Sequence, residues 1–175
     1  MHQTHLLNFY NEFIIKQDYF ECHEIMEEQW KEKERFTKKD PEVFLILIAT
    51  AEYHYRRGNL SGAETSYKRA LKLFQEAPFI LRKYGLSENA VEVFENRLHN
   101  INYVNFKVIE FPLSCEYFLM LQELIMPEAS PETFKVFIDN LKVLDEQTVH
   151  KHKMRDRAPV IAERLQSLKN KNREE

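Results

Sequence analysis

Glycine is scarce in this chain, because only 3 of its 175 residues are glycine. A protein made only of β-strands needs many tight turns, and glycine most readily adopts the backbone conformations of those turns. The shortage therefore argues against an all-β fold and favours long helices. The length fits one domain with its own hydrophobic core, and we expect a single domain over residues 1–175.

The chain also lacks an excess of basic charge and is poor in cysteine. Its 25 Lys and Arg residues stand against 28 Asp and Glu residues, a formal net charge of −3. That balance gives no general attraction to nucleic acid, so a nucleic-acid partner is not expected. Cys22 and Cys115 belong to no metal-ligand spacing and lie among apolar residues. Both are predicted to be reduced and buried, as in a cytosolic protein.

Long apolar runs are missing as well. The longest, VFLILIATA, has nine residues, whereas a helix needs about 20 to cross a bilayer. The first residues, MHQTHLLNFYNEF, lack the basic start and the apolar run of a signal peptide. We therefore expect a cytoplasmic protein that does not enter a membrane.

Apolar residues recur at helical spacing along most of the chain. Asp18 is the expected N-cap of the second helix, with Glu21 at the capping-box position. Ser61, Ser87 and Ser130 are the expected N-caps of later helices. Residues 101–113 hold four β-branched residues and a proline, so a loop or a short extended piece is predicted there. The predicted helices cover residues 4–16, about 19–34, 42–57, from 61, from 87, 114–126 and from 131.

The expected fold is therefore all-α: a single compact domain of about seven helices built around helical hairpins. Residues 87–170 form a looser helical part, and residues 170–175 form a polar tail that is expected to fray.

One predicted helix is rich in polar chemistry. The stretch YFECHEIMEEQW, residues 19–30, holds one His, four Glu and three large aromatic residues. At about 100° per residue, His23 falls in the apolar stripe of this helix, and Glu27 borders the stripe one turn further on. Glu24 lies further round, toward water. His23 and Glu27 are therefore expected near the edge of the core, where an unpaired charge is costly.

Two interpretations of these residues remain open. His23, Glu24 and Glu27 form either an acid/base or metal site, or a satisfied polar network that locks helix to helix. The sequence HEIME is not the zinc-protease pattern HExxH, because the second His is missing. It is not the di-iron pattern ExxH either, because position 20 is Phe. We favour the structural network and expect no cofactor, with a divalent metal at His23, Glu27 and His54 as the alternative.

The next predicted helix ends in EYHYRRGN, which supplies candidate partners for Glu27. If the two helices pack antiparallel, His54, Arg56 and Arg57 lie near His23 and Glu27. An arginine can meet a carboxylate with two parallel hydrogen bonds. A His–Glu–Arg cluster is therefore predicted to hold the hairpin together.

These two stretches also carry a recognisable pattern, F-E-x-H-E-x-x-E-x-x-W followed by Y-H-x-R-R-G-N-x-x-G-A. The pattern resembles the signature of a bacterial and archaeal family, the domain of unknown function 309. The tail HKHKMRDRAPVIAERL is similar to the C-terminal segment of its Bacillus-type members. The resemblance covers most of the chain, strongly over a family-like core at about residues 4–76 and more loosely beyond it. It implies a compact all-helical fold and no established activity. The residues that carry it are Phe20, Glu21, His23, Glu24, Glu27, Trp30, Tyr53, His54, Arg56, Arg57, Gly58, Asn59, Gly62 and Ala63.

The central helix departs from the family pattern. Phe44 and Leu47 stand where family members tend to have Gly and Gln, and Glu52 replaces an apolar residue. If the family's Gln lines a polar pocket, Leu47 makes that pocket drier.

Two further stretches carry binding hypotheses. GNLSGAETSYKRALKLF resembles half of a tetratricopeptide repeat, but no second copy follows at a period of about 34 residues. We favour an amphipathic core helix there, with peptide binding in a groove left open. Residues 150–157 gather basic side chains, for which a solvated helix face is favoured over a phosphate or nucleic-acid contact. These side chains are His150, Lys151, His152, Lys153, Arg155 and Arg157.

The leading hypothesis is a non-enzymatic cytoplasmic helical domain that binds a protein or peptide partner. The alternative is a metal-dependent or acid/base hydrolase that uses His23, Glu24 and Glu27. A weaker alternative is nucleic-acid binding through residues 150–157. The aromatic content of 13% also leaves room for an apolar interface and a homodimer.

Overall fold

The structure is a computed structural model, and it describes residues 3–142 and 148. Within this part the chain forms seven α-helices and no strand, which confirms the all-α fold. The α-helices are α1 (Gln3–Tyr10), α2 (Tyr19–Lys31), α3 (Pro41–Arg56), α4 (Leu60–Glu76), α5 (Ala90–Asn100), α6 (Cys115–Ile125) and α7 (Pro131–Asn140). A π-helix η1 (Asn11–Lys16) follows α1, and a short 3-10 helix η2 (Leu81–Tyr84) precedes α5.

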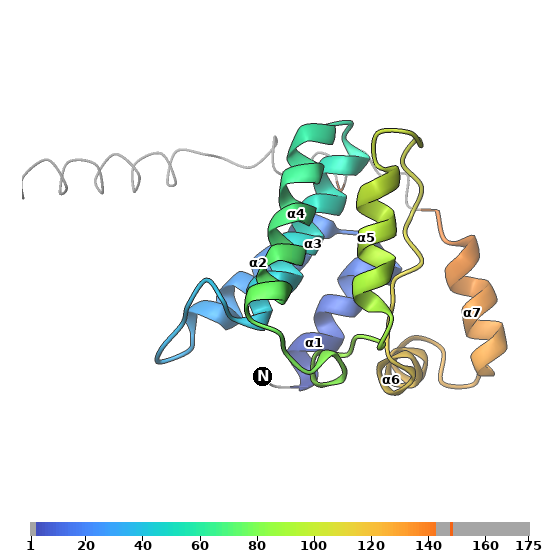
Figure 1. The fold of residues 1–175 in the computed structure, drawn as a ribbon. Coiled ribbons are helices and arrows are strands. Elements are labelled where there is room, and N and C mark those ends of the chain that lie inside the picture. Colours follow the sequence, from blue (N-terminus) through green and yellow to red (C-terminus); the bar gives the residue numbers. More distant parts are fainter. Residues whose placement is uncertain (1–2, 143–147, 149–175) are drawn as a thin grey trace, which may run out of the picture.

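Helix α3 is the centre of the fold. It packs against α2 and against α4, so these three helices make two consecutive hairpins. Its apolar residues face both neighbours, and Phe44, Leu45 and Ile48 are fully buried. Helix α1 packs on α2, α5 lies along α4, and α6 and α7 lie beyond α1 and α5 (Figure 1).

The N-caps of the helices confirm some of the sequence predictions and contradict others. The Asp18 side chain accepts a hydrogen bond from Glu21 N at 3.0 Å, and Ser130 accepts one from Thr133 N at 3.2 Å, as predicted. Ser61 is not the cap of α4. Asn59 precedes the first helical residue, and its side chain accepts from Gly62 N at 3.0 Å. Ser87 does not cap α5 either.

The start of α5 has a different arrangement. Asn89 is its N-cap residue, without a side-chain cap bond. The Ser87 hydroxyl instead donates to Asn89 Oδ1 at 2.6 Å, and the Ser87 carbonyl accepts from Ala90 N at 3.1 Å. The polar residues expected near the helix start are therefore present, but the chain enters α5 through a turn.

Residues 101–113 contain no helix, as predicted: a turn at 101–104 leads into an extended segment, whose Phe106, Ile109 and Phe111 pack against the core. Leu113 pairs with Leu86 in an isolated antiparallel bridge. Ser114 N donates to the carbonyl of Gly85 at 2.8 Å. Gly85 has a φ of +74°, and a Cβ there would lie 2.6 Å from the Tyr10 ring, so glycine is required at this crossing.

None of the helices in the described part has the length and apolar character needed to cross a membrane. The predictions for residues 150–157 and for the tail at 170–175 fall outside the described residues.

Candidate functional site

Several family-motif residues join the start of α2 to the end of α3. The Phe20 and Tyr53 rings lie 5.9 Å apart between the two helices. The Arg57 guanidinium lies 4.9 Å from the centre of the Tyr53 ring and donates to the Tyr53 hydroxyl at 2.6 Å. The two helices are therefore antiparallel neighbours at this point, as the hairpin prediction requires.

Arg56 holds the backbone where α2 begins. Its Nη1 donates to the carbonyl of Gln17 at 2.6 Å, and its guanidinium lies 4.5 Å from the centre of the Tyr19 ring. Gln17 has a φ of 52°, a left-handed conformation that turns the chain from η1 into α2. Burial lowers the pKa of Arg56, while the nearby Tyr19 and Asp18 act to raise it.

The motif residues in the loops fix chain turns. Gly58 has a φ of +72° after α3, a conformation that suits glycine. Asn59 caps α4, and its Nδ2 lies 3.0 Å from His54 Nδ1. The Trp30 indole donates to the carbonyl of Thr37 at 2.9 Å and so holds the loop after α2. The backbone N–H of Glu21 donates a hydrogen bond to the side chain of Asp18, the N-cap of α2.

Three motif residues converge instead on the outer face of α2. His23 Nδ1 lies 3.2 Å from Glu24 Oε1, and His23 Nε2 lies 3.7 Å from Glu27 Oε2. One ligand atom from each residue can be chosen so that all lie within 4.8 Å of one another. The side chains are 30%, 34% and 33% exposed. The His23 ring stacks on Phe20, with ring centres 6.1 Å apart, which fixes its orientation.

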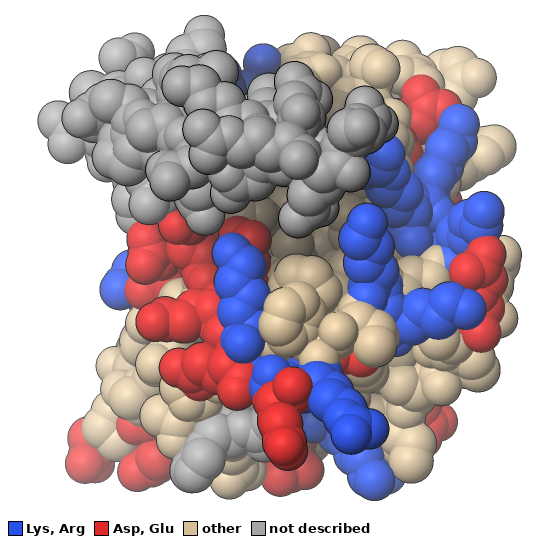
Figure 2. All heavy atoms as spheres, turned by 90° about the vertical axis from the view of Figure 1, so that its left-hand side faces the viewer, with Lys and Arg blue, Asp and Glu red and all other residues tan. Residues whose placement is uncertain are grey.

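The predicted His–Glu–Arg cluster therefore divides into two parts. Arg56 binds the backbone of Gln17, and Glu27 pairs with Lys31 at 2.7 Å one turn further along α2. The carboxylates of α2 border a shallow open depression lined by Glu24, Glu27, Glu28, Lys31 and Glu32. Figure 2 shows that acidic and basic side chains gather on separate parts of the side of the molecule that it views. An open acidic face of this kind can hold a cation, but it does not exclude water.

The buried charge network lies elsewhere and was missed by sequence reasoning. Glu52 of α3 is fully buried, and Arg97 of α5 donates to its two oxygens at 2.9 Å and 2.7 Å. The Tyr67 hydroxyl of α4 also donates to Glu52. Burial acts to lower the pKa of Arg97, but its hydrogen bonds to Glu52 outweigh burial and raise it. The available signal was an acid directly after the apolar run VFLILIATA, because a carboxylate buried with that run requires a polar or charged partner.

Arg97 also fastens the segment 101–113 to the core. Its Nη2 donates to the carbonyl of Lys107 at 2.7 Å, and its guanidinium lies 4.6 Å from the centre of the Tyr55 ring. The Tyr55 hydroxyl donates to the carbonyl of Val104 at 2.5 Å. The departure from the family pattern at Glu52 thus anchors the segment that forms one wall of a pocket.

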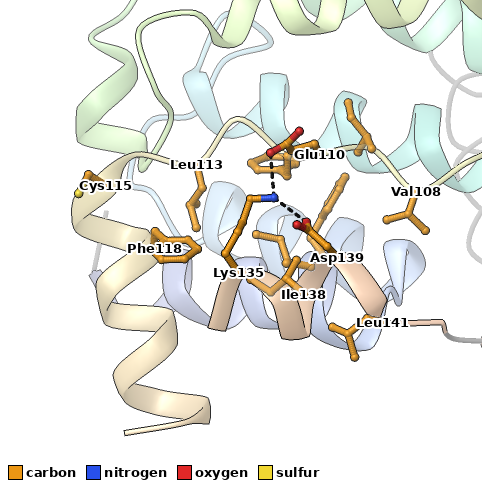
Figure 3. Close-up of a pocket in the computed structure, with 13 residues that line it drawn as sticks. Val108, Glu110, Leu113, Cys115, Phe118, Lys135, Ile138, Asp139 and Leu141 are labelled. Carbon is orange, nitrogen blue, oxygen red and sulfur yellow. Dashed lines mark hydrogen bonds and ion pairs between the residues drawn. The ribbon is translucent and has the colours of Figure 1, made fainter. Parts of the chain in front are cut away.

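That pocket lies between η1, residues 108–113, α6 and α7 and has a volume of about 410 Å³ (Figure 3). Ligand pockets measure roughly 300–1,000 Å³ and are mostly apolar. No sequence motif marks this one, because its walls come from four separated segments. Its apolar walls include Phe13, Ile14, Phe111, Phe118, Ile138 and Leu141.

Three charged residues form the rim of this pocket. Lys135 Nζ lies 3.0 Å from Glu110 Oε1 and 2.5 Å from Asp139 Oδ1, so its ammonium bridges the extended segment and α7 (Figure 3). The side chains of Glu110, Asp139 and Lys135 are 80%, 52% and 42% exposed. We call these residues the acidic rim.

Cys115 also lines the pocket, and it corrects a prediction. Cys22 is buried as expected, but Cys115 is exposed, and neither is in a disulfide. Cys115 is the first residue of α6, directly after the N-cap Ser114, so its side chain leaves the core at a helix end. Its neighbours in the sequence are apolar, which led to the prediction that it is buried. Adjacent residues of a helix point to different sides, so apolar neighbours do not imply that Cys115 itself is buried.

Comparison with known proteins confirms the family resemblance. Residues 6–65 match the family described as "Domain of unknown function (DUF309)". The chain is 29% identical over 179 residues to the "Uncharacterized protein YpuF" of Bacillus subtilis (strain 168). The alignment covers 99% of this chain and 98% of that protein. No solved structure matches.

Proposed function

We propose that this protein, whose residues 6–65 match the family described as domain of unknown function 309, is a binding module for a partner protein. The partner inserts an apolar segment into the pocket between α6, α7 and residues 108–113. The observation that carries this proposal is the pocket itself, with a volume of about 410 Å³ and mainly apolar walls.

The composition of the pocket favours binding over catalysis. Among the described residues of the pocket, the charged groups of Glu110, Lys135 and Asp139 are paired with each other at the acidic rim. Val108, which lines the pocket, is 46% exposed, and Leu119 of α6 is 44% exposed.

A peptide selection tests the proposal. A random peptide library is selected against the full chain, and the enriched peptides are then measured on two variants of α7. Ile138→Asn removes an apolar wall, whereas Val136→Asn changes a residue of α7 that is 60% exposed and does not line the pocket. We expect peptides that bind the parent and Val136→Asn but lose at least about tenfold in affinity on Ile138→Asn.

As a control, circular dichroism should show that both variants keep their helices. Blocking Cys115 with a bulky maleimide is a second way to fill the pocket. Peptides that bind all these forms equally would overturn the proposal. A selection that enriches no peptide would do the same.

A second candidate function rests on the convergence of His23, Glu24 and Glu27 within 4.8 Å. Imidazole with carboxylates suits Zn²⁺ or Mn²⁺, and open coordination positions would face water. Such an ion could serve the hydrolase considered from the sequence. Calorimetric titration with each metal tests this, with Glu28→Gln as a control of equal charge change beside the cluster. Loss of metal binding in Glu27→Gln but not in Glu28→Gln supports the site, and equal binding by both variants excludes it.

A further inference from the structure

We infer that the partner segment is a basic amphipathic helix, with apolar side chains in the pocket and Lys or Arg side chains on the acidic rim. This inference rests on the proposed function and adds the chemical class of the partner. Its evidence is the charge around the pocket. Among the described residues that line it, the charged ones are Glu110, Asp139 and Lys135, two carboxylates and one ammonium.

The two carboxylates have capacity for further hydrogen bonds. Lys135 approaches one oxygen of each, Glu110 Oε1 and Asp139 Oδ1. A carboxylate has about four lone-pair positions, and the side chains of Glu110 and Asp139 are 80% and 52% exposed. A second cation can therefore bind from the solvent side, and it would neutralise the negative charge that remains at the rim.

The ammonium of Lys135 occupies the position between Glu110 and Asp139 that a cation of the partner would take. Its ammonium joins the two walls of the pocket across the rim, but its side chain is 42% exposed and ends a flexible stem. Exposed ion pairs of this type contribute little to stability. An incoming Lys or Arg can thus displace Lys135 or share its carboxylates at little cost.

The surroundings favour a helix over a small amphiphile. The carboxylates of the rim stand outside the apolar walls, and Val108 exposes 46% of its surface at the edge of the pocket. A small ligand would leave these groups uncovered. An amphipathic helix presents apolar anchors one turn apart and flanking charges to a groove, which matches both features.

The test compares two synthetic amphipathic helical peptides with identical apolar residues, one with Lys and one with Glu at the flanking positions. Affinities are measured by fluorescence anisotropy for the full chain. The charge-removing pair Glu110→Gln with Asp139→Asn is compared with Glu123→Gln and Glu128→Gln, two exposed acids outside the pocket. At low salt we expect the Lys peptide to bind about tenfold more tightly than the Glu peptide.

That preference should vanish in the rim variant, persist in the control variant and shrink at about 0.5 M salt. Lys135→Gln should strengthen binding of the Lys peptide, because it frees both carboxylates. Equal or tighter binding of the Glu peptide would overturn the basic partner while leaving the binding module intact. If neither peptide binds while library peptides do, this inference fails and the proposed function stands.

Two other occupants are distinguished in the same set of measurements. Sedimentation velocity without peptide reports a second copy of this chain: a dimer that Ile138→Asn abolishes would overturn the inference. A short alkylamine that binds as tightly as the Lys peptide would identify a small cationic amphiphile instead.

Discussion

Two acidic sites of this molecule, one in α3 and one on α2, have different surroundings. Glu52 is fully buried and receives hydrogen bonds from Arg97 and Tyr67. The carboxylates of Glu24 and Glu27 are about one third exposed and share a histidine, His23, and Glu27 also pairs with the exposed Lys31. The first site joins α3, α4 and α5, whereas the second lies along one face of a single helix.

The difference shows that a family motif does not by itself locate the charge on which a fold depends. The motif residues Phe20 and Tyr53 do pack between helices. The carboxylate buried deepest in the core is Glu52, where the chain departs from the family pattern. Burial and the number of elements joined therefore distinguish structural charges from charges that remain available to a ligand.

The largest effect is expected for Glu52→Gln. The change keeps the side-chain shape but leaves the Arg97 guanidinium, which is only 15% exposed, without its carboxylate. Breaking a buried pair by removing one partner costs about 3–5 kcal/mol. Urea unfolding followed by circular dichroism should show a loss of this size. A loss below about 1 kcal/mol would mean that Arg97 finds another acceptor or more water than its burial indicates.

A second expected difference concerns the two thiols. Cys22 is fully buried, and burial raises the pKa of its thiol, whereas Cys115 is exposed beside the pocket. Because the thiolate is the reactive form, a buried thiol of raised pKa is inert. A colorimetric thiol reagent should therefore detect one thiol in the folded protein and two in denaturant. Mass mapping should place the first adduct on Cys115, and an adduct on Cys22 would contradict its burial.

The sequence predicted the fold better than it predicted the polar contacts. The apolar spacing of residues 42–57 depends on one helix alone, so the central position of α3 could be inferred. The cap at Asp18 is also local, since its donor is three residues away. Both predictions need only the chain near the residue concerned.

The two main features that sequence reasoning missed, the Glu52–Arg97 pair and the pocket, join distant segments. Glu52 and Arg97 are 45 residues apart, and nothing in the local sequence of either pairs them. The pocket draws its walls from η1, residues 108–113, α6 and α7. For Glu27, helical periodicity gave the correct neighbour, His23, one turn away. Periodicity could not tell that Arg56 would bind Gln17, because the left-handed turn at Gln17 presents its carbonyl there.

The start of α4 gives a smaller test. Asn59→Ala removes the side chain that accepts from Gly62 N, and loss of an N-cap costs about 1 kcal/mol. Ser61→Ala, at the position predicted from the sequence, should leave the free energy of unfolding nearly unchanged. Thermal unfolding of both variants separates the two positions. Equal losses of stability in the two variants would mean that Ser61 also stabilises the start of α4.

The smallest effect is expected for Glu27→Gln. Its carboxylate is 33% exposed and pairs with Lys31 and His23 along α2. Exposed pairs one turn apart contribute about 0.3–0.5 kcal/mol, so metal-free protein should lose no more than that, far less than Glu52→Gln. If the α2 cluster binds a divalent ion, adding Zn²⁺ should raise the melting temperature of the parent and not of Glu27→Gln, since a ligand that binds only the folded state stabilises it. A loss of several kcal/mol without metal would make Glu27 a second structural charge and remove the contrast with Glu52.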